Sequence, residues 1–585
     1  MWGLIHYAVK RPHLSHWASA ETLCDPKLGE SLALLRIMCG SDEHVALESG
    51  YRAAMLARVQ DGLYWDTCNP RRPWRNSYAP AFYGAGKDED FCTTPGAGRM
   101  LRAMLVWRDM GWQPALMDQK LGELTAGLRR IAVCKDDYCY YPEKGGWSEP
   151  CAYPRSGWLN TDEAESETEG GEGAVTCMHG HQVYGAAHWY AVSKDPVALD
   201  LAARLTRYVM KPRFWGGVPD PGGDRKGLAG HVAPRLPDPA CTSGAEQGHW
   251  YSHFHARAIT LRAILEYGVA AGDERAAEFV RRAYEFTQSQ GIPRMGWINC
   301  YPAATNLCEG CALGDLVALG IRLSDLGLGD YWDDVDAVVR NQLAEQQLTR
   351  ADLLRRVSEH STGQGWHEGN AYPGQLFYAE DIFERTLGVF GGTAAPTAIP
   401  GVWVMHCCTG NATQGLYYAW EGILRESGSA AEVNLFLNRA GRLVDIHSYL
   451  PFEGRLVIRN KAATRVAVRL PAWIVKDQLR VEVSGRSVEP DWVGRRLVLR
   501  GLAAGDTMSL TFPVRATSAR YTVNARTAQE QVYTCNFRGS TLVDITPRDT
   551  APTSYPLYDR GHLRGTSAPM RQVERYVADH VVTQW

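Results

Sequence analysis

Apolar residues recur at helical spacing through the first two-thirds of the chain, interrupted by short polar turns. This spacing indicates helices with a buried face, and the Gly and Asp residues at the joints are typical of helix ends and caps. The predicted helical hairpins pair residues 28–39 with 43–59, 98–110 with 114–131, 181–192 with 196–210, 253–270 with 274–290, 311–326 with 331–348, and 375–387 with 412–424. Six hairpins in series predict an (α/α)6 toroid, with its active site where the inner helices begin. An open helical solenoid is the alternative, but the hairpins share little sequence, which argues against a regular repeat.

After about residue 432 the pattern changes from helical spacing to alternation of apolar and polar residues. Short alternating runs, such as 455–459, 465–470 and 496–499, are separated by Gly, Asp and Pro. This texture predicts an antiparallel β-sandwich. At 585 residues the chain is too long for one ordinary core. We therefore expect two domains, a catalytic (α/α)6 domain over residues 1–431 and a β-sandwich domain over residues 432–585 that ends in a tail.

Composition excludes several classes of partner. The formal net charge of −3 gives no reason to expect nucleic acid or an anionic membrane surface. No run approaches the roughly 20 apolar residues of a membrane span, and the start of the chain lacks the basic and apolar regions of a signal peptide. The fifteen cysteines are odd in number and scattered, which is typical of reduced thiols with a metal site rather than of a disulfide framework. The expected location is the cytoplasm.

Two cysteine clusters open apolar helical segments. His406-Cys407-Cys408 is followed by a potential N-cap at Thr409 or Asn411. About a hundred residues earlier, Cys308-Glu309-Gly310-Cys311 precedes a second apolar helix. A helix N-terminus favours negative charge and lowers the pKa of a thiol. Cysteine-rich helix starts together with a glutamate therefore indicate a metal site. One interpretation is a closed zinc site of four cysteines that includes Cys308, although such sites usually take their ligands from two CxxC knuckles rather than from adjacent cysteines.

Histidines and glutamates supply further candidates for a sugar site. We interpret His181, His253 and His255 as polar contacts in a sugar-binding cavity, with metal binding as the alternative for the histidine cluster. Glu368 lies in a Gly-rich loop beside Trp366, His367 and Asn370, which are typical sugar-contacting types, and it is our candidate catalytic acid. Glu246 is the second candidate for that role.

The cysteine motifs resemble glycoside hydrolase family 127, the β-L-arabinofuranosidase-like group. The resemblance rests on Glu309-Gly310-Cys311 opening a helix, on residues 334–341 in the next helix, and on His406-Cys407-Cys408. Residues 449–454 and 468–473 also resemble the strand region of that family. The resemblance covers about residues 180–513 at a remote level, and it implies an (α/α)6 barrel followed by β-sandwich domains.

The resemblance also implies a zinc ion and a mechanism. Its ligands would be Glu309, Cys311, Cys407 and Cys408, and Cys407 would be the nucleophile. A thiolate kept deprotonated by zinc can attack an anomeric carbon, and water then releases the sugar with net retention. The expected function is a zinc-dependent retaining glycoside hydrolase, β-L-arabinofuranosidase-like, that removes a terminal sugar from an oligosaccharide or glycoside.

This sequence departs from the family pattern at two places. Thr409-Gly410-Asn411 follows the cysteine pair, where the family usually has Pro-Pro-Asn. The family's general-acid glutamate precedes the zinc glutamate by some sixteen residues, but residues 293–300 contain no carboxylate. Two other functions therefore stay open. One is an inactive glycan-binding protein with a structural zinc, and the other is a toroidal polysaccharide lyase that uses histidines and a tyrosine.

Overall fold

The computed structural model describes most of the chain. The described residues are 2–17, 21–66, 89–142, 151–159, 161–162, 174–215, 247–248, 250, 253–301, 305–363, 377–525 and 528–585.

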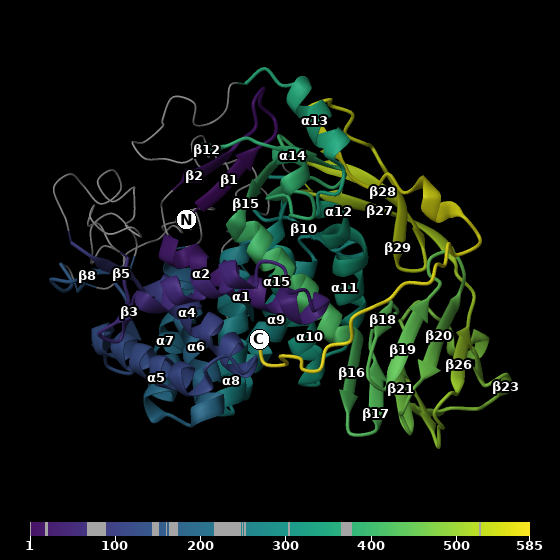
Figure 1. Ribbon diagram of the computed structural model, residues 1–585, viewed down its shortest axis with the longest axis horizontal. Helices are drawn as coiled ribbons and strands as arrows, with labels where there is room; N and C mark the ends of the chain where they lie inside the picture. The colour runs from purple at the N-terminus through teal and green to yellow at the C-terminus, as the bar shows by residue number, and fades with distance from the viewer. Residues whose placement is uncertain are drawn as a thin grey trace.

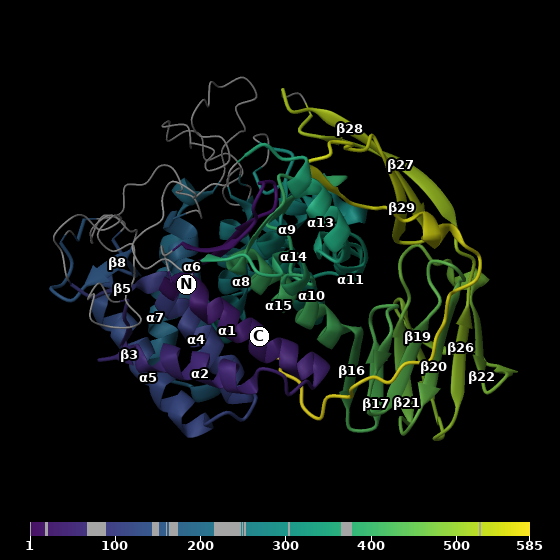
Figure 2. The same cartoon turned by 45° about the horizontal axis from the view of Figure 1, so that its top comes forward.

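A closed ring of six helices forms the centre of the helical part, within these residues (Figures 1 and 2). The inner helices are α1 (Glu21–Cys39), α4 (Thr94–Asp109), α6 (Ala174–Ser193), α8 (Phe254–Ala271), α10 (Gly310–Asp325) and α15 (His406–Ile423). Each packs against the next in this order, and α15 packs against α1 to close the ring. Burial explains their weak amphipathicity: in α4 every residue from Thr94 to Trp107 is buried.

Outer helices follow the first five inner helices. They are α2 (Val45–Ala57), α5 (Pro114–Ile131), α7 (Pro196–Val209), α9 (Glu274–Gln288), and the continuous series α11 (Trp332–Ala337), η4 (Val338–Leu343) and α12 (Ala344–Gln346). Several start where the sequence predicts caps. The Asp195 carboxylate accepts a hydrogen bond from Val197 N–H, and the Asp273 carboxylate accepts from Arg275 and Ala276 N–H. The first five predicted hairpins are confirmed, and their alternation gives all inner helices the same direction.

The sixth predicted hairpin is only half right. Helix α15 is present and begins at His406, six residues before the predicted start at residue 412. The predicted helix at 375–387 is wrong where the structure describes it: β12 (Phe377–Tyr378) pairs with β2 (Leu14–Trp17), and α14 (Ile382–Arg385) is one turn. Asp381, at a left-handed φ of 48°, separates them, so no single helix can run through. A helix that we did not predict, α13 (Ala351–Glu359), precedes this segment.

Two short strands lead directly into the cysteine-bearing helices. β15 (Trp403–Met405) pairs with β1 (Trp2–His6) and ends where α15 starts. β11 (Cys308–Glu309) pairs with β13 (Thr393–Ala394) and ends where α10 starts. Each pairing fixes the backbone immediately before a helix N-terminus, and so positions the first side chains of that helix.

The region after the ring is rich in strands, as predicted. One sheet has the order β16 (Leu424–Ser427), β17 (Ala430–Val433), β21 (Arg465–Arg469), β25 (Arg496–Arg500), β24 (Asp491–Val493). The other has the order β18 (Arg439–Ala440), β19 (Val444–Ser448), β20 (Arg455–Asn460), β26 (Thr507–Thr511), β22 (Arg480–Val483), β23 (Arg486–Ser487). All pairings in these two sheets are antiparallel except β17 with β21, which is parallel. The strands start at Leu424, directly after α15; a sandwich of these sheets and a domain boundary at 431/432 stay predictions.

The end of the chain returns to the helical ring, as the yellow segment in Figure 1 shows. A sheet of β27 (Ala516–Val523), β28 (Gln531–Arg538) and β29 (Thr541–Thr546) comes first, and β30 (Ser554–Pro556) then pairs with β14 (Ala398–Pro400). Val582 exchanges hydrogen bonds with the Tyr417 hydroxyl, and the Trp585 ring stacks on Tyr418 at 3.9 Å between centroids. Both tyrosines lie in the C-terminal half of α15, so the tail covers the end of the ring opposite to its cysteines.

None of the helices in the described part of the chain is both long and apolar enough to span a bilayer.

Candidate functional site

The N-terminal ends of the inner helices bring the candidate residues together at one end of the ring. Cys407 and Cys408 lie in the first turn of α15, and Cys311 lies in the first turn of α10. Glu309 is the N-cap residue of α10, and His255 lies in the first turn of α8. Since the partial positive charges of several helix starts meet here, the local field stabilises thiolates and carboxylates.

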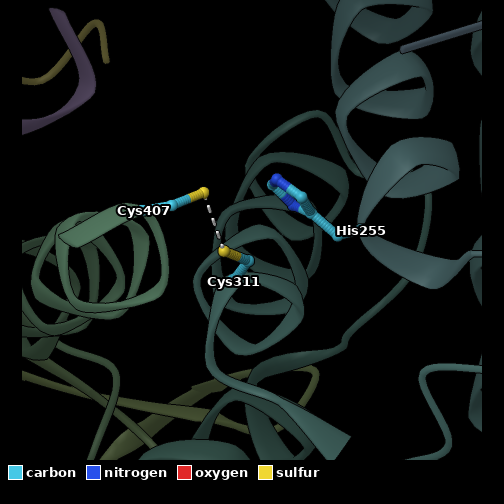
Figure 3. Close-up of side chains that lie close together, drawn as sticks. All are labelled: His255, Cys311 and Cys407. Carbon is cyan, nitrogen blue, oxygen red and sulfur yellow. Dashed lines mark hydrogen bonds between the residues drawn. The ribbon is translucent and has the colours of Figure 1, made fainter. Parts of the chain in front are cut away.

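Four buried cysteines form a cluster at this end: Cys24, Cys311, Cys407 and Cys408. The Sγ atoms of Cys311 and Cys407 are 3.6 Å apart (Figure 3). Cys24 comes from α1, where nothing in the local sequence marks it as a site residue, and it enters the cluster only because the ring closes α1 against α15.

A buried ammonium group neutralises the cluster. Lys27 Nζ donates a hydrogen bond to Cys407 Sγ at 2.9 Å and lies 4.0 Å from Cys311 Sγ. Lys27 is one turn after Cys24 on α1, so the ring closure that brings the fourth thiol also brings this cation. The pKa of Lys27 is raised above its ordinary value; burial opposes this, as does Arg99, but the charge interactions with the neighbouring cysteines outweigh both. The raised pKa favours the charged ammonium form of Lys27 beside Cys407.

Cys407 is the thiol of the cluster that ionises first. Hydrogen bonds from the thiols of Cys24, Cys311 and Cys408 hold the pKa of Cys407 well below its usual value, and Lys27 adds to this against the cost of burial. The pKa values of the other three thiols are well above the usual value. For Cys24 and Cys311 burial is the largest cause. The cluster thus concentrates negative charge on Cys407 Sγ, the property that a sulfur nucleophile or metal ligand needs.

Glu309 faces the same cluster from α10. Its Oε2 is 2.6 Å from His253 Nε2, and Cys408 Sγ donates to its Oε1 at 3.7 Å. Burial raises the pKa of Glu309, but the contacts with His253 outweigh it, and the net pKa lies below the ordinary value. The His253 ring also stacks on Tyr301, with centroids 4.8 Å apart. Glu309 is therefore an ionised carboxylate at the thiol cluster, and His253 contacts it directly.

His255 lies beside two thiols of the cluster. Its Nδ1 lies 2.7 Å from Asp315 Oδ2, and Arg262 Nη1 donates to the other oxygen of Asp315 at 3.0 Å. Its Nε2 is buried and has no hydrogen-bond partner among the described residues. Figure 3 shows the ring beside the sulfur atoms of Cys311 and Cys407.

The residues present fit a soft divalent metal. Two groups of ligand atoms each lie within 4.8 Å of one another, namely His255, Cys311 and Cys407, and Glu309, Cys311 and Cys408. Both groups are buried and share Cys311. Thiolate, imidazole and carboxylate are the donors that zinc takes, and an unpartnered buried imidazole nitrogen is a vacant donor. Each of the four residues predicted as ligands occurs in at least one of these groups, and their role as ligands stays a prediction. His255, predicted as a sugar contact, belongs to the first group.

Cys308 stays outside both groups. It is adjacent to Glu309 in β11, and successive side chains of a strand point to opposite faces. Cys308 packs with the apolar core, where burial raises its pKa to about 12. The interpretation of a closed four-cysteine site that includes Cys308 is therefore not supported, whereas Glu309 lies at the cluster.

His181 lies in the wall of this region. Its Nε2 accepts a hydrogen bond from Arg99 Nε at 2.9 Å, and Arg99 Nη1 reaches Cys24 Sγ at 3.8 Å. Burial and the charge of Arg99 lower the pKa of His181 well below its ordinary value, so the ring is neutral. Contacts of His181, His253 and His255 with a sugar stay predictions. Glu368 and Glu246 lie outside the described residues.

Two glycines allow α10 and α15 to approach closely enough to join the cysteines. A Cβ on Gly314 would lie 2.3 Å from Asn411 O, and a Cβ on Gly415 would lie 2.7 Å from Gly314 Cα. Both obstacles are backbone atoms, so no side chain can rotate away. The close contact lies within one turn of Cys311 on α10 and within two turns of Cys407 on α15.

We expect Gly314→Ala to destabilise the protein by about 1–3 kcal/mol, the usual cost of overpacking a core. Gly122→Ala is the matched control. Gly122 lies in α5 with no atom within 4 Å of an added Cβ, so this change should stabilise by about 0.5–1 kcal/mol through helix propensity. Urea unfolding of both variants measures the difference. Equal stability of the two variants would show that α10 and α15 can accommodate a Cβ at position 314, and that their close approach does not require glycine there.

Comparison with known proteins gives structural matches only. No family model matches the sequence, and no curated protein matches it. One solved structure with a similar fold is Ara127N-Se, a glycoside hydrolase family 127 β-L-arabinofuranosidase from Geobacillus stearothermophilus T6, with 14% identity, TM-score 0.51, and 88% of this chain and 75% of that chain covered. The family 127 β-arabinofuranosidase BT3674 matches with 14% identity, TM-score 0.53, and 88% and 74% covered. The chain shares the family 127 fold. A further structure, described as a glycoside hydrolase, has 12% identity, TM-score 0.53, and 92% and 83% covered.

At this level of identity the likeness to family 127 concerns the fold. It agrees with the predicted toroid, because the match covers 88% of this chain, whose described helical part contains a closed ring of six inner helices. The match therefore establishes the fold. The chemistry of the site has to be inferred from the residues of this chain.

Proposed function

We propose that this protein is a zinc-dependent retaining glycoside hydrolase that removes a terminal sugar, β-L-arabinofuranosidase-like, with Cys407 as nucleophile. One observation carries the proposal: Cys407 Sγ lies 2.9 Å from Lys27 Nζ and 3.6 Å from Cys311 Sγ, at the end of a ring of helix N-termini, and these neighbours hold its pKa well below the usual value. A low pKa separates a reactive thiol from the many inert buried cysteines of proteins. The shared fold with family 127 enzymes supports the choice of glycosides as substrates.

The proposed chemistry has two displacements. In the first, Cys407 Sγ attacks the anomeric carbon, the C–S bond forms, the glycosidic C–O bond breaks, and the leaving oxygen takes a proton from an acid. In the second, water attacks the same carbon, its proton goes to the conjugate base of that acid, and Cys407 leaves as a thiolate. Two inversions at one carbon give net retention. Lys27 holds the negative charge of Cys407 in place before the first step and after the second.

Glu309, Cys311, Cys407 and Cys408 would hold the zinc ion. When bound, zinc would keep the thiols deprotonated and lower the pKa of its ligands. Their burial and the ionised state of Glu309 support this set. His253, which contacts Glu309 Oε2, orients the carboxylate in the way that outer partners usually orient metal ligands.

Glu368 remains our candidate for the acid, with Glu246 as the second. We expect replacement of the true acid by glutamine to slow substrates with poor leaving groups by about 10²–10⁴-fold and to affect activated aryl glycosides much less, because a good leaving group needs little protonation. Rates for a natural-type disaccharide and a nitrophenyl glycoside of the same sugar measure this difference in Glu368→Gln and Glu246→Gln. The same loss on both substrates would exclude the acid role.

A substrate screen tests the function. The full chain, purified under reducing conditions, is incubated with aryl glycosides and oligosaccharides that carry furanose or pyranose ends, and the products are read for reducing sugar and for unsaturated sugar. Release of a terminal reducing sugar supports the proposal. Unsaturated products would instead indicate a lyase, and tight glycan binding without turnover would indicate a binding protein.

A further inference from the structure

His255 and Asp315 form a buried pair that the proposed reaction does not use. The side chain of His255 is fully buried, as is that of Asp315, and their contact of 2.7 Å joins α8 to α10. Arg262, about two turns further along α8, donates to the second oxygen of Asp315 at 3.0 Å. Asp315 is therefore fixed from two sides, and it can hold the histidine ring in only one orientation.

That orientation leaves Nε2 as the ring nitrogen that does not contact Asp315. Asn411 Nδ2 is also near His255 Nδ1, but at 3.4 Å it is much further away than Asp315 Oδ2 at 2.7 Å. The Nδ1 proton is thus donated to the carboxylate, which leaves Nε2 as the nitrogen with a lone pair. Nε2 is buried without a hydrogen-bond partner in the described part of the chain, and leaving such an acceptor unpaired is unfavourable.

The surroundings of this nitrogen are those of a metal ligand. A ring nitrogen of His255, Cys311 Sγ and Cys407 Sγ all lie within 4.8 Å of one another, and Figure 3 shows the three side chains converging from three different helices. Histidines that ligate metals almost always donate their second ring N–H to a carboxylate, a carbonyl or water. Asp315 supplies that carboxylate here, and Arg262 balances its charge.

We propose that His255 is a ligand of the metal centre through Nε2, on the side of Cys407, and that Asp315 is its positioning residue. The proposal rests on the metal centre of the proposed function and deepens it: the centre takes nitrogen as well as sulfur and oxygen donors. A nitrogen donor beside Cys407 would give a bound metal a ligand that takes no part in the displacement at the sugar. Zinc accepts such a set, since catalytic sites of this ion combine imidazole with thiolate or carboxylate and expand to five ligands when needed.

X-ray absorption at the zinc edge tests the ligand directly in the unaltered protein. The full chain, reduced and loaded with zinc chloride alone, is expected to show one imidazole ring together with sulfur scatterers. This measurement needs no variant, so a failure of a variant to fold cannot obscure it. A spectrum with sulfur and oxygen but no imidazole would overturn the proposal.

Variants test the positioning role through metal affinity rather than activity. Asp315→Asn is expected to weaken zinc binding about 10–100-fold, the usual effect of losing the partner of a ligating histidine, and His255→Gln at least as much. His188→Gln is the matched control, because His188 is also an inner-helix histidine paired with a carboxylate, Glu266, at 3.2 Å, but at the other end of the ring. Competition with a chromophoric chelator measures the zinc affinity of all three variants. Unchanged affinity in folded Asp315→Asn and His255→Gln would overturn the proposal.

The outcomes separate this inference from the function that underlies it. If the unaltered protein binds no zinc, the metal centre of the proposed function fails, and His255 loses its role with it. If zinc binds through Glu309 and the cysteines without imidazole, only the role of His255 fails, and the hydrolase proposal is unaffected.

Discussion

Replacing Cys407 with serine is expected to reduce turnover by about 10⁴-fold or more, the order of loss when the nucleophile of a covalent hydrolase is removed. The physical reason is the pKa. Hydrogen bonds from neighbouring thiols hold the pKa of the Cys407 thiol well below its usual value, whereas a serine hydroxyl stays protonated there and is a poor nucleophile without a base. Steady-state rates on the best substrate of the screen measure the loss, and circular dichroism confirms that the fold is retained.

Two controls separate nucleophilic attack from packing and metal binding. Cys535 is a buried cysteine of β28, remote from the cluster, so Cys535→Ser should retain turnover. Cys408→Ser should act chiefly through weaker zinc binding, so excess zinc should restore part of its activity but none of the activity of Cys407→Ser. Turnover at a normal rate by Cys407→Ser would show that the sulfur does not attack the sugar.

Replacing Glu309 with glutamine is expected to weaken zinc binding by at least about 100-fold, while Cys308→Ser binds zinc normally. The loss of a ligand should exceed the roughly 10–100-fold effect of losing a group that only orients one. The two residues are neighbours in β11, and they differ in what they face: Glu309 Oε1 is 3.7 Å from Cys408 Sγ, and Cys308 packs in the apolar core. Both variants are dialysed against a weak chelator, and the zinc that each retains is measured by elemental analysis.

This pair of variants also decides between the two ligand sets. A set with Cys308 in place of Glu309 predicts the reverse result, namely loss of zinc in Cys308→Ser and retention in Glu309→Gln. A buried serine at 308 costs stability, so both variants are compared at a temperature well below their unfolding transitions.

The helical part was predictable because its signals are local. Helical periodicity with Gly and Asp at the joints marked five hairpins, and the structure has all five. The prediction of a helix at 375–387 was wrong because two of its apolar residues lie in a β-strand. Phe377 and Tyr378 pair with Ser15 and Leu14 in a small sheet. That pairing joins segments more than 350 residues apart, and no local pattern records it.

The site was predictable only where its residues share short motifs. Glu309, Cys311, Cys407 and Cys408 stand in two such motifs, and the fold brings both to one cluster. Cys24 and Lys27 were missed because each is a single ordinary residue of α1, brought to the cluster by closure of the ring. Asp315 was missed for a related reason. Its contact with His255 joins two different helices, and the local sequence around Asp315 does not indicate this contact.

The most direct test of the central claim is the mass of the covalent intermediate. The full chain, loaded with zinc, is mixed with an excess of an activated substrate found in the screen, quenched in acid within the first turnovers, digested and mapped by mass spectrometry. We expect one added glycosyl group on the peptide that contains Cys407, and none in Cys407→Ser. A glycosyl group on another residue of the turning-over enzyme, or a product of inverted configuration with no adduct, would contradict this claim.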